Sequence, residues 1–319
     1  MRRMEKKPLI VLTGPTAVGK TSLSIRLAKA VGGEIISADS MQVYRGMDIG
    51  SAKITPSQMQ GVPHHLVDVL DPEEDFNVFL FQKLAFEAME KIYAAGHVPI
   101  LVGGTGFYIQ AVTKEVDFTK EAADGEYRRS LEELARQQGA EALHEMLARV
   151  DPKSAEAIHA HNVKRVIRAL EYYEQNHSPI SEHNQAERAK SSPYQLAYFV
   201  LNAPRPLLYQ RIDARVDEMM EQGLLHEVES LYERGCRRGM SSMQGLGYKE
   251  ILDYLTGDIE TLEEAVDTIK RDTRHFAKRQ LTWFRREGDV IWVDKDRFDY
   301  DEDRILDFML ECIRAESQE

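Results

Sequence analysis

A glycine-rich motif near the N-terminus has the residues needed to bind phosphate. Residues 14–21 read GPTAVGKT, which matches the pattern G-x-x-x-x-G-K-[ST]. An apolar run at residues 9–13 precedes the motif and helical apolar spacing at residues 23–31 follows it, which predicts a strand, a loop and a helix. The amides of such a loop and the helix N-terminus wrap phosphate oxygens, while the lysine adds positive charge and the last hydroxyl can bind Mg²⁺. We expect phosphate contacts from Gly14, Pro15, Thr16, Ala17, Val18, Gly19, Lys20 and Thr21, with Thr21 as the metal ligand. The alternative is a glycine-rich turn without a ligand.

The phosphate motif leaves open which bond breaks, because a kinase cleaves between phosphates whereas a prenyltransferase expels an intact diphosphate from carbon. Asp39 is the first candidate to decide between them. It follows a predicted strand over residues 34–38, at the sheet edge where the phosphate loop also lies. Its carboxylate could hold magnesium through water, take a proton from a nucleophile or cap the next turn, and the sequence favours neither base nor cap. Ser40, Met41 and Gln42 are placed to contact whatever Asp39 deprotonates.

A second candidate, Thr105, follows another predicted strand. The segment ILVGGTGFY at residues 100–108 ends that strand in glycines, which permit close backbone approach, and presents the Thr105 hydroxyl at the same sheet edge. No acidic residue follows this strand, so the usual aspartate of a nucleotide hydrolase is absent from the position. The hydroxyl could bond a leaving-group oxygen. A tight strand-to-helix turn is the alternative.

Two arginines on a later helix could complete a phosphate site. Arg211 and Arg215 are four residues apart, on a face different from the apolar positions of that helix. They suit bidentate capture of a diphosphate. Nearby Asp213, Asp217 and Glu218 make a solvated ion-pair surface an equal alternative.

The elements that must position these residues are those of an α/β protein. Buried strands are predicted at residues 9–13, 34–38, 66–70, 98–102, 196–201 and 290–293, with helices between several of them. A parallel sheet flanked by helices, a P-loop-type core, is therefore expected. Between about residues 113 and 192 helical patterns dominate, which predicts a helical insertion. The expected division is a first core part at 1–113, a helical insertion at 114–192, and a return to the core with C-terminal helices at 193–319.

Six separated segments together resemble a known family. GPTAVGKT, ISADSMQVYRGMDIGSAK, GVPHHLVDV, ILVGGTGFY, NVKRVIRALE and QGLGYKE occur in the order and spacing of the bacterial tRNA dimethylallyltransferases, also called tRNA adenine isopentenyltransferases. The resemblance covers most of the chain. It implies transfer of a dimethylallyl group from dimethylallyl diphosphate to the N6 amine of the adenine 3′-adjacent to the anticodon, in tRNAs reading codons that begin with U, with release of diphosphate.

The resemblance also implies roles for individual residues. Asp39 would be the general base, Thr105 would bond the bridging oxygen of the donor, and Lys20 and Arg215 would stabilise the diphosphate together with Mg²⁺. Arg211 is also expected to bind the donor, because it lies four residues from Arg215 on the same helix. Contacts with tRNA are expected at Asp39, Ser40, Met41, Gln42, Thr105, Arg128, Lys164, Arg165, Val166, Ile167, Arg168, Gln244, Gly245, Leu246, Gly247, Tyr248 and Lys249.

The bulk composition bears on the partners. The formal net charge of −12 argues mildly against nucleic acid, so local basic patches must hold the RNA. A basic stretch at residues 270–286 is one such patch, although a solvated face over an apolar stripe accounts for most of it. Cys236 and Cys312 lack redox or metal spacing, and no apolar run is long enough for a membrane span, which predicts a cytoplasmic protein. A monomer is expected. His64 and His65 are interpreted as structural, and no bound zinc is predicted.

Two other functions compete with this interpretation. A small-molecule or nucleoside kinase also needs a phosphate loop, magnesium and arginines. A noncatalytic RNA-binding module would keep the loop as a remnant. The joint presence of Lys20, Asp39, Thr105 and Arg215 argues against the module.

Overall fold

The computed structural model describes residues 6–118 and 125–316. It divides the chain into two compact units. The core unit comprises Met1–Thr113 and Pro193–Glu319, and the helical unit comprises Lys114–Ser192. None of the helices within the described residues combines the length and the apolar character needed to span a bilayer.

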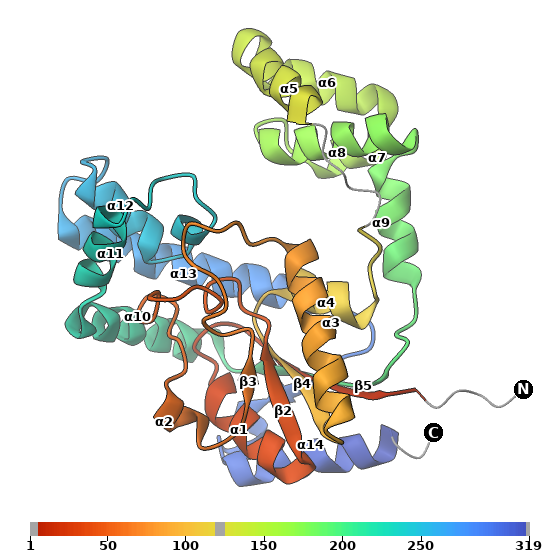
Figure 1. The fold of residues 1–319 in the computed structure, drawn as a ribbon, viewed down its shortest axis with the longest axis vertical. Helices are drawn as coiled ribbons and strands as arrows, with labels where there is room; N and C mark the ends of the chain where they lie inside the picture. The colour runs from red at the N-terminus through yellow and green to blue at the C-terminus, as the bar shows by residue number, and fades with distance from the viewer. Residues whose placement is uncertain (1–5, 119–124, 317–319) are drawn as a thin grey trace, which may run out of the picture. The chain divides into compact units, whose positions relative to one another are not determined.

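A six-stranded sheet forms the centre of the core unit (Figure 1). Its order is β3-β2-β4-β1-β5-β6 and every neighbouring pair is parallel, which confirms the predicted α/β class. Thr13 at the end of β1 pairs with Gly103 at the end of β4, and Ser37 at the end of β2 pairs with Val102. The carboxyl ends of these three strands therefore meet at one edge. The strands are β1 (Pro8–Thr13), β2 (Gly33–Ser37), β3 (His64–His65), β4 (Val98–Gly103), β5 (Gln195–Asn202) and β6 (Ile291–Asp294).

Alternate residues of the strands enter two different hydrophobic cores. In β1, Leu9 and Val11 belong to one core whereas Ile10 and Leu12 belong to the other, and all four are buried. Successive side chains of a strand point to opposite faces, so the sheet is covered on both sides. This double burial explains why its strands are nearly continuous apolar runs in the sequence.

Helices cover the two faces. On one face α1 (Lys20–Val31) and α14 (Glu302–Glu316) contact each other and contribute side chains to the core around Ile10. They lie at the bottom of Figure 1. On the other face α3 (Val78–Ala94) and α4 (Gly106–Thr113) join the core around Leu9. The remaining helical segments of the core unit are α2 (Pro56–Met59), α10 (Arg205–Gln222), α11 (Leu224–Glu233), η1 (Ser242–Gln244), α12 (Tyr248–Leu255), α13 (Leu262–Phe284) and η2 (Lys295–Phe298).

One predicted strand, over residues 66–70, is wrong. The strand at this place is β3, which ends at His65, and Leu66 and Asp68 then adopt φ of 63° and 53°. Positive φ values interrupt an extended chain. Leu66 is nevertheless buried, because the segment pairs with the loop between β2 and α2 through amides that Asp68 and Val69 donate to Gln42 and Val43. The other five predicted strands are confirmed within one or two residues.

The helical unit has its own small core. Its helices are α5 (Gly125–Gln138), α6 (Ala140–Val150), α7 (Pro152–Ala157), α8 (Val163–Asn176) and α9 (Ile180–Ala189). Leu131, Leu143, Leu147, Val166 and Leu170 pack together at its centre. Asp151, which is 1% exposed, caps α7 through the Ser154 amide and also accepts from the amide and hydroxyl of Ser181. These hydrogen bonds outweigh desolvation and lower the pKa of Asp151.

Candidate active site

The phosphate loop connects β1 to the N-terminus of α1. Gly14 has φ of 145°, and a Cβ on it would lie 2.5 Å from the carbonyl oxygen of Leu201 in β5. Gly19, with φ of 90°, is the N-cap residue that directly precedes α1. A glycine cap leaves the first amides of the helix without a side-chain acceptor, so they can bind an anion. The strand, loop and helix predicted around residues 14–21 are therefore confirmed.

Lys20 supplies a buried positive charge to this loop. Its Nζ donates to the carbonyl oxygens of Gly14 and Pro15, each at 3.0 Å. Burial lowers the pKa of Lys20 to about 8, the charge of Asp39 opposes this lowering, and the charge of Arg215 adds to it. A desolvated ammonium gains from a nearby anion, so the loop favours a phosphate ligand.

Asp39 lies just beyond the end of β2. The Met41 amide donates to its Oδ1 at 2.8 Å and the Gln42 amide at 3.4 Å. Among the described residues both hydrogen bonds of this carboxylate go through Oδ1. Asp39 therefore caps the turn, as one of the sequence alternatives expected. The cap leaves the second oxygen available to accept a proton.

Thr105 lies at the end of β4 and begins the turn into α4. Its amide donates to the carbonyl of Ala38, the residue before Asp39, at 3.4 Å. The strand ends approach closely here, since a Cβ on Gly103 would lie 2.2 Å from that same carbonyl oxygen. The glycines therefore bring the Thr105 and Asp39 turns together, as the sequence predicted.

A cavity of about 980 Å³ joins these groups. Most of the residues predicted for the donor and for the base line it: Thr16, Ala17, Gly19, Lys20, Thr21, Asp39, Ser40, Met41, Gln42 and Thr105. Gly14, Pro15 and Val18 are buried and are not among the lining residues. Most of the residues predicted to bind phosphate, the Asp39 carboxylate and the Thr105 hydroxyl thus line one cavity.

The two arginines of α10 lie in different surroundings. Arg215 lines the cavity, and partial desolvation there lowers its pKa. Arg211 is half-buried and its guanidinium lies over the Tyr300 ring, 5.6 Å from the centroid. Arg211 does not line the cavity in this conformation, and capture of one diphosphate by both guanidiniums stays a prediction.

The acidic residues of α10 have partners of their own on α13. Asp213 accepts from Arg274, and Asp217 pairs with Lys270, each at 2.5 Å. Asp213 and Asp217 are therefore paired with α13, whereas the charge of Glu218 still acts on Arg215 and partly offsets the lowering of its pKa. Two residues of the basic stretch at 270–286 thereby have a structural role, as the more conservative interpretation expected.

Other residues of that stretch surround a second, shallower hollow. It is lined by His275, Lys278, Arg279, Thr282, Trp283 and Arg286, and Arg279 also lines the main cavity. Basic side chains beside an indole ring can contact nucleic acid through charge and stacking. Whether they do so here remains a prediction.

The segment predicted to contact tRNA at residues 244–249 forms another wall of the cavity. Gln244, Gly245, Leu246 and Lys249 line it, whereas Gly247 and Tyr248 are buried. A Cβ on Gly245 would lie 2.6 Å from the sulfur of Met41. This wall is therefore packed directly on the Asp39 turn.

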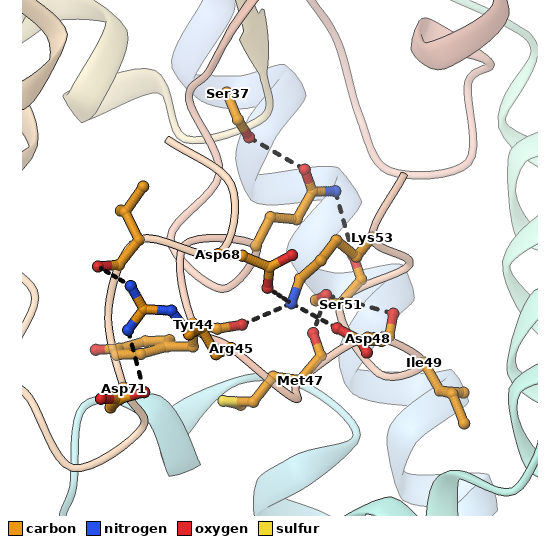
Figure 2. Close-up of polar contacts among 12 residues, drawn as sticks. Ser37, Tyr44, Arg45, Met47, Asp48, Ile49, Ser51, Lys53, Asp68 and Asp71 are labelled. Atoms are coloured by element: carbon orange, nitrogen blue, oxygen red, sulfur yellow. Dashed lines mark hydrogen bonds and ion pairs between the residues drawn. The ribbon is translucent and has the colours of Figure 1, made fainter. Parts of the chain in front are cut away.

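The loop between β2 and α2, residues 38–55, is fixed by Lys53 (Figure 2). Lys53 has only 4% of its side chain exposed, and its Nζ donates at 2.6 Å to the carboxylates of Asp48 and Asp68 and to the Tyr44 carbonyl. Gln42 adds a second connection, because its side chain contacts the Ser37 hydroxyl at 3.1 Å. These contacts hold the polar groups that follow Asp39 in place. They also commit the Gln42 side chain to the protein, although Gln42 lines the cavity.

Within the helical unit, the residues predicted to contact tRNA divide by exposure. Lys164 and Arg165 are exposed on α8 and Arg168 is half-buried. Val166 and Ile167 are 0% and 4% exposed and pack in the core of this unit, so their side chains do not offer an RNA contact. Arg128 forms a two-pronged pair with Glu171, with Nε–Oε1 at 2.9 Å and Nη2–Oε2 at 2.6 Å.

His64 and His65 have protein partners. His64 Nδ1 contacts the Val62 carbonyl, and burial lowers the pKa of His64. His65 Nε2 contacts one oxygen of Glu34 at 2.6 Å while His97 contacts the other, also at 2.6 Å. His64 and His65 therefore stabilise the β2–β3 edge, which is the structural role expected for them.

Three further residues of the site were not predicted from the sequence. Gln280 lines the cavity from α13, Glu227 binds loop amides from α11, and Lys53 anchors the same loop. Lys53 is the last residue of the motif ISADSMQVYRGMDIGSAK, so the motif contains a signal for it. Gln280 and Glu227 are polar residues on helices, and their partners in the loops of the site are more than 170 positions away in sequence.

Two family models match the chain. The model described as "IPP transferase" matches residues 42–287, and the one described as "Isopentenyl transferase" matches residues 7–70. A tRNA dimethylallyltransferase of Lachnoclostridium phytofermentans is 61% identical over 295 residues, which are 92% of this chain and 94% of that relative.

Solved structures agree as well. The full-length tRNA isopentenylpyrophosphate transferase of Bacillus halodurans has a TM-score of 0.73 and 48% identity, covering 98% of this chain and 99% of its own. A eukaryotic dimethylallyltransferase, described as acting on tRNA, has a TM-score of 0.77 and 31% identity, covering 90% of this chain and 74% of its own. The kinase alternative is therefore not favoured, and the chain belongs to the family of tRNA dimethylallyltransferases, a family of prenyltransferases.

Proposed function

We propose that this chain transfers the dimethylallyl group of dimethylallyl diphosphate to the N6 amine of the adenine 3′-adjacent to the anticodon, in tRNAs reading codons that begin with U. The observation that carries this proposal is the meeting of Asp39, Thr105 and the phosphate loop in one cavity. Prenyl transfer needs a base beside the attacking amine and groups that stabilise negative charge beside the leaving diphosphate. The Asp39 carboxylate lines the same cavity as Lys20 and Arg215, which supports this proposal.

Asp39 is the proposed base. An exocyclic adenine amine is a poor nucleophile because its lone pair is delocalised into the ring, so removal of a proton during attack helps. The nitrogen forms a bond to the first carbon of the prenyl chain while the bond from that carbon to the bridging oxygen breaks. The electron pair of the broken bond leaves with diphosphate, and the amine proton passes to the Asp39 carboxylate.

The leaving diphosphate is stabilised by groups that are already in place. Lys20, Arg215 and the amides of the phosphate loop supply positive charge where negative charge grows. The Thr105 hydroxyl donates to the bridging oxygen as the bond to carbon breaks. Positive character on the allylic carbon is delocalised over its double bond, so the transition state is polar at both ends.

The donor set of the cavity fits Mg²⁺. The Thr21 hydroxyl and the Asp39 carboxylate both line it, and Mg²⁺ prefers such oxygen ligands together with phosphate oxygens and waters. Thr21 would hold the ion beside the diphosphate, with Asp39 reaching it through water. When bound, the ion supplies charge neutralisation to the leaving group.

The second substrate is tRNA, and the target adenine must leave the loop stack to enter the cavity. An unpaired loop makes this step inexpensive. Basic side chains offset the net charge of −12 locally, and those proposed to touch RNA are Arg128, Lys164, Arg165, Arg168 and Lys249. The proposed setting is the cytoplasm, and the proposed state is a monomer. The free thiols Cys236 and Cys312 are compatible with a reducing compartment.

The test uses purified protein, Mg²⁺, dimethylallyl diphosphate and unmodified tRNA with adenine 3′ of the anticodon, followed by mass spectrometry of the digested nucleosides. Isopentenyl adenosine is expected from the wild-type chain. Asp39→Asn is the sharper control, because the amide oxygen still caps the Met41 amide but has no useful basicity, and no product is expected from it. Wild-type rates in Asp39→Asn would reduce Asp39 to a cap. Phosphorylation of a small acceptor by ATP, or tRNA binding without product, would support the kinase or the binding module instead.

A further inference from the structure

Gln280 connects two segments of the active site that are far apart in sequence. Its Oε1 accepts the Thr16 amide of the phosphate loop at 3.0 Å, and its Nε2 donates to the Gly104 carbonyl at 2.9 Å. The side chain lines the cavity and is 6% exposed. Both ends of one buried amide are therefore satisfied, one by each segment.

The Gly104 carbonyl belongs to the same peptide group as the Thr105 amide. Gln280 holds this peptide on its carbonyl side, and the Ala38 carbonyl accepts its N–H at 3.4 Å. Ala38 directly precedes Asp39. One planar peptide thus connects the ends of β2 and β4 and, through Gln280, the phosphate loop. Its orientation sets where the Thr105 hydroxyl lies.

The fit of α13 on this turn depends on two glycines. A Cβ on Gly104 would lie 2.1 Å from Nε2 of Gln280, and a Cβ on Gly106 would lie 2.2 Å from the Trp283 ring. Gln280 and Trp283 are three residues apart and lie on one face of the helix. Helix α13 therefore packs on this turn through two side chains, Gln280 and Trp283, and Gln280 makes the polar contact.

Glutamine suits this position better than the acid of the same shape. Its amide provides one acceptor and one donor, which match one N–H and one carbonyl. A carboxylate would keep the acceptor, would lose the donor and would place negative charge beside a diphosphate. A methionine would keep the volume and lose both hydrogen bonds.

We infer that Gln280 is a positioning residue that sets the Thr105 hydroxyl against the phosphate loop, so that the loop and the hydroxyl meet the same diphosphate in register. This inference rests on the proposed role of Thr105 in prenyl transfer. Gln280 acts through Thr105 and forms no bond to the reacting atoms. A displacement of about 1 Å in such a group can reduce a rate about 100-fold.

A double-mutant cycle tests the inference. Single-turnover prenyl transfer is measured at saturating tRNA and donor for wild type, Gln280→Met, Thr105→Val and the double variant. We expect a loss of about 10- to 100-fold from Gln280→Met in the wild-type background. In the Thr105→Val background the same change should cost less than about threefold, because there is no hydroxyl left to position.

Separate measurements distinguish positioning from a loss of structure. Gln222→Met on the exposed end of α10 is the matched control and should leave the rate unchanged. Affinity for tRNA should also be unchanged in Gln280→Met. If this variant fails to fold, Gln280→Asn, which keeps a neutral amide on a side chain one carbon shorter, takes its place in the cycle.

The outcomes separate this inference from the proposed function. Losses that multiply in the double variant would overturn the inference and leave prenyl transfer intact. A wild-type rate in Thr105→Val would remove the role of Thr105 and the inference with it. Absence of product from the wild-type chain would instead count against the proposed function.

Discussion

The Tyr248 hydroxyl donates a hydrogen bond of 2.7 Å to Glu227. The same carboxylate accepts three consecutive amides of the loop between β2 and α2, at 2.9, 2.8 and 3.1 Å from Asp48, Ile49 and Gly50. Burial raises the pKa of Tyr248 well above its usual value, so it remains a donor. An anion in a nest of amides is held by strong charge-assisted bonds. Glu227 therefore connects two walls of the cavity, the Asp39 loop and the segment that leads into α12.

Glu227→Gln should loosen that connection. The amide group cannot accept as many hydrogen bonds and directs its own N–H groups at donors, so about 1–3 kcal/mol of stability should be lost. We expect the KM for tRNA to rise about tenfold while affinity for the donor stays unchanged, because the phosphate loop is not part of the nest. Thermal unfolding and steady-state kinetics measure both. Tyr248→Phe removes the bond to Glu227 and the bond that the hydroxyl accepts from the Ser51 amide, and should cost about 1–3 kcal/mol. An unchanged KM in Glu227→Gln would contradict this role.

Donor binding should depend on pH through Lys20. Burial lowers its pKa to about 8, and a bound diphosphate favours the charged form, so binding takes up a proton above that pH. The Kd for dimethylallyl diphosphate should rise between pH 8 and 9.5, by up to about tenfold per pH unit. Calorimetric titration in buffers of different ionisation heat measures both the Kd and the proton uptake.

The ligand-free protein should show the opposite trend in stability. Between about pH 8 and 10.5 the unfolded chain binds the Lys20 proton more tightly than the folded chain, so the free energy of unfolding contributed by this group rises with pH. Lys20→Arg stays charged throughout and should bind the donor weakly but with a flat pH profile. A Kd for the donor that does not change with pH in the wild type would show that donor binding is not coupled to the protonation of Lys20.

Substitutions of Arg215 and Arg211 can be compared directly to test which arginine stabilises the leaving group. Arg215 lines the cavity, whereas Arg211 lies over the Tyr300 ring. Arg215→Ala should lower the single-turnover rate about 100- to 1,000-fold, the range for loss of one group that stabilises developing charge. Arg211→Ala should change the rate less than about threefold and cost about 0.5–1 kcal/mol of stability. Equal losses in the two variants would mean that Arg211 moves into the cavity when the donor binds.

Local patterns predicted the parts of this site that depend on short stretches of chain. Residues 14–21 specify a turn whose glycines, lysine and hydroxyl act within one loop, and the glycines after β4 specify a close approach of strand ends. The meeting of Asp39 and Thr105 followed because parallel strands end at a common edge.

Tertiary contacts decided what the patterns missed. The apolar residues at 66–70 are buried by a loop whose positive φ at Leu66 the sequence does not signal, so the prediction of a strand was wrong. Arg211 and Arg215 are four residues apart on one helix, but Arg211 lies over the Tyr300 ring whereas Arg215 lines the cavity. The partners of Gln280 are 176 and 264 residues away in sequence, and no local spacing indicates such a connection.

Arg128 and Glu171 test whether a residue expected at the tRNA surface also holds the helical unit together. Glu171 is 1% exposed and accepts both prongs of the guanidinium, so Arg128→Met leaves a buried charge without its partner. The loss of stability should be about 2 kcal/mol, which is below the ~3–5 kcal/mol of a fully buried pair because the Arg128 side chain is 45% exposed and water screens it. Hydrogen exchange of the helical unit measures it, and Arg129→Met is the exposed control.

The double variant Arg128→Met/Glu171→Leu separates the two roles of Arg128. Removing both charges restores stability, because replacement of a buried pair by apolar groups is often neutral. If Arg128 also contacts tRNA, as the family resemblance implies, tRNA affinity should remain several-fold below wild type in this stable variant, and the salt dependence of binding should fall by about one phosphate contact. Wild-type affinity and salt dependence in the double variant would show that Arg128 serves the fold of the helical unit alone.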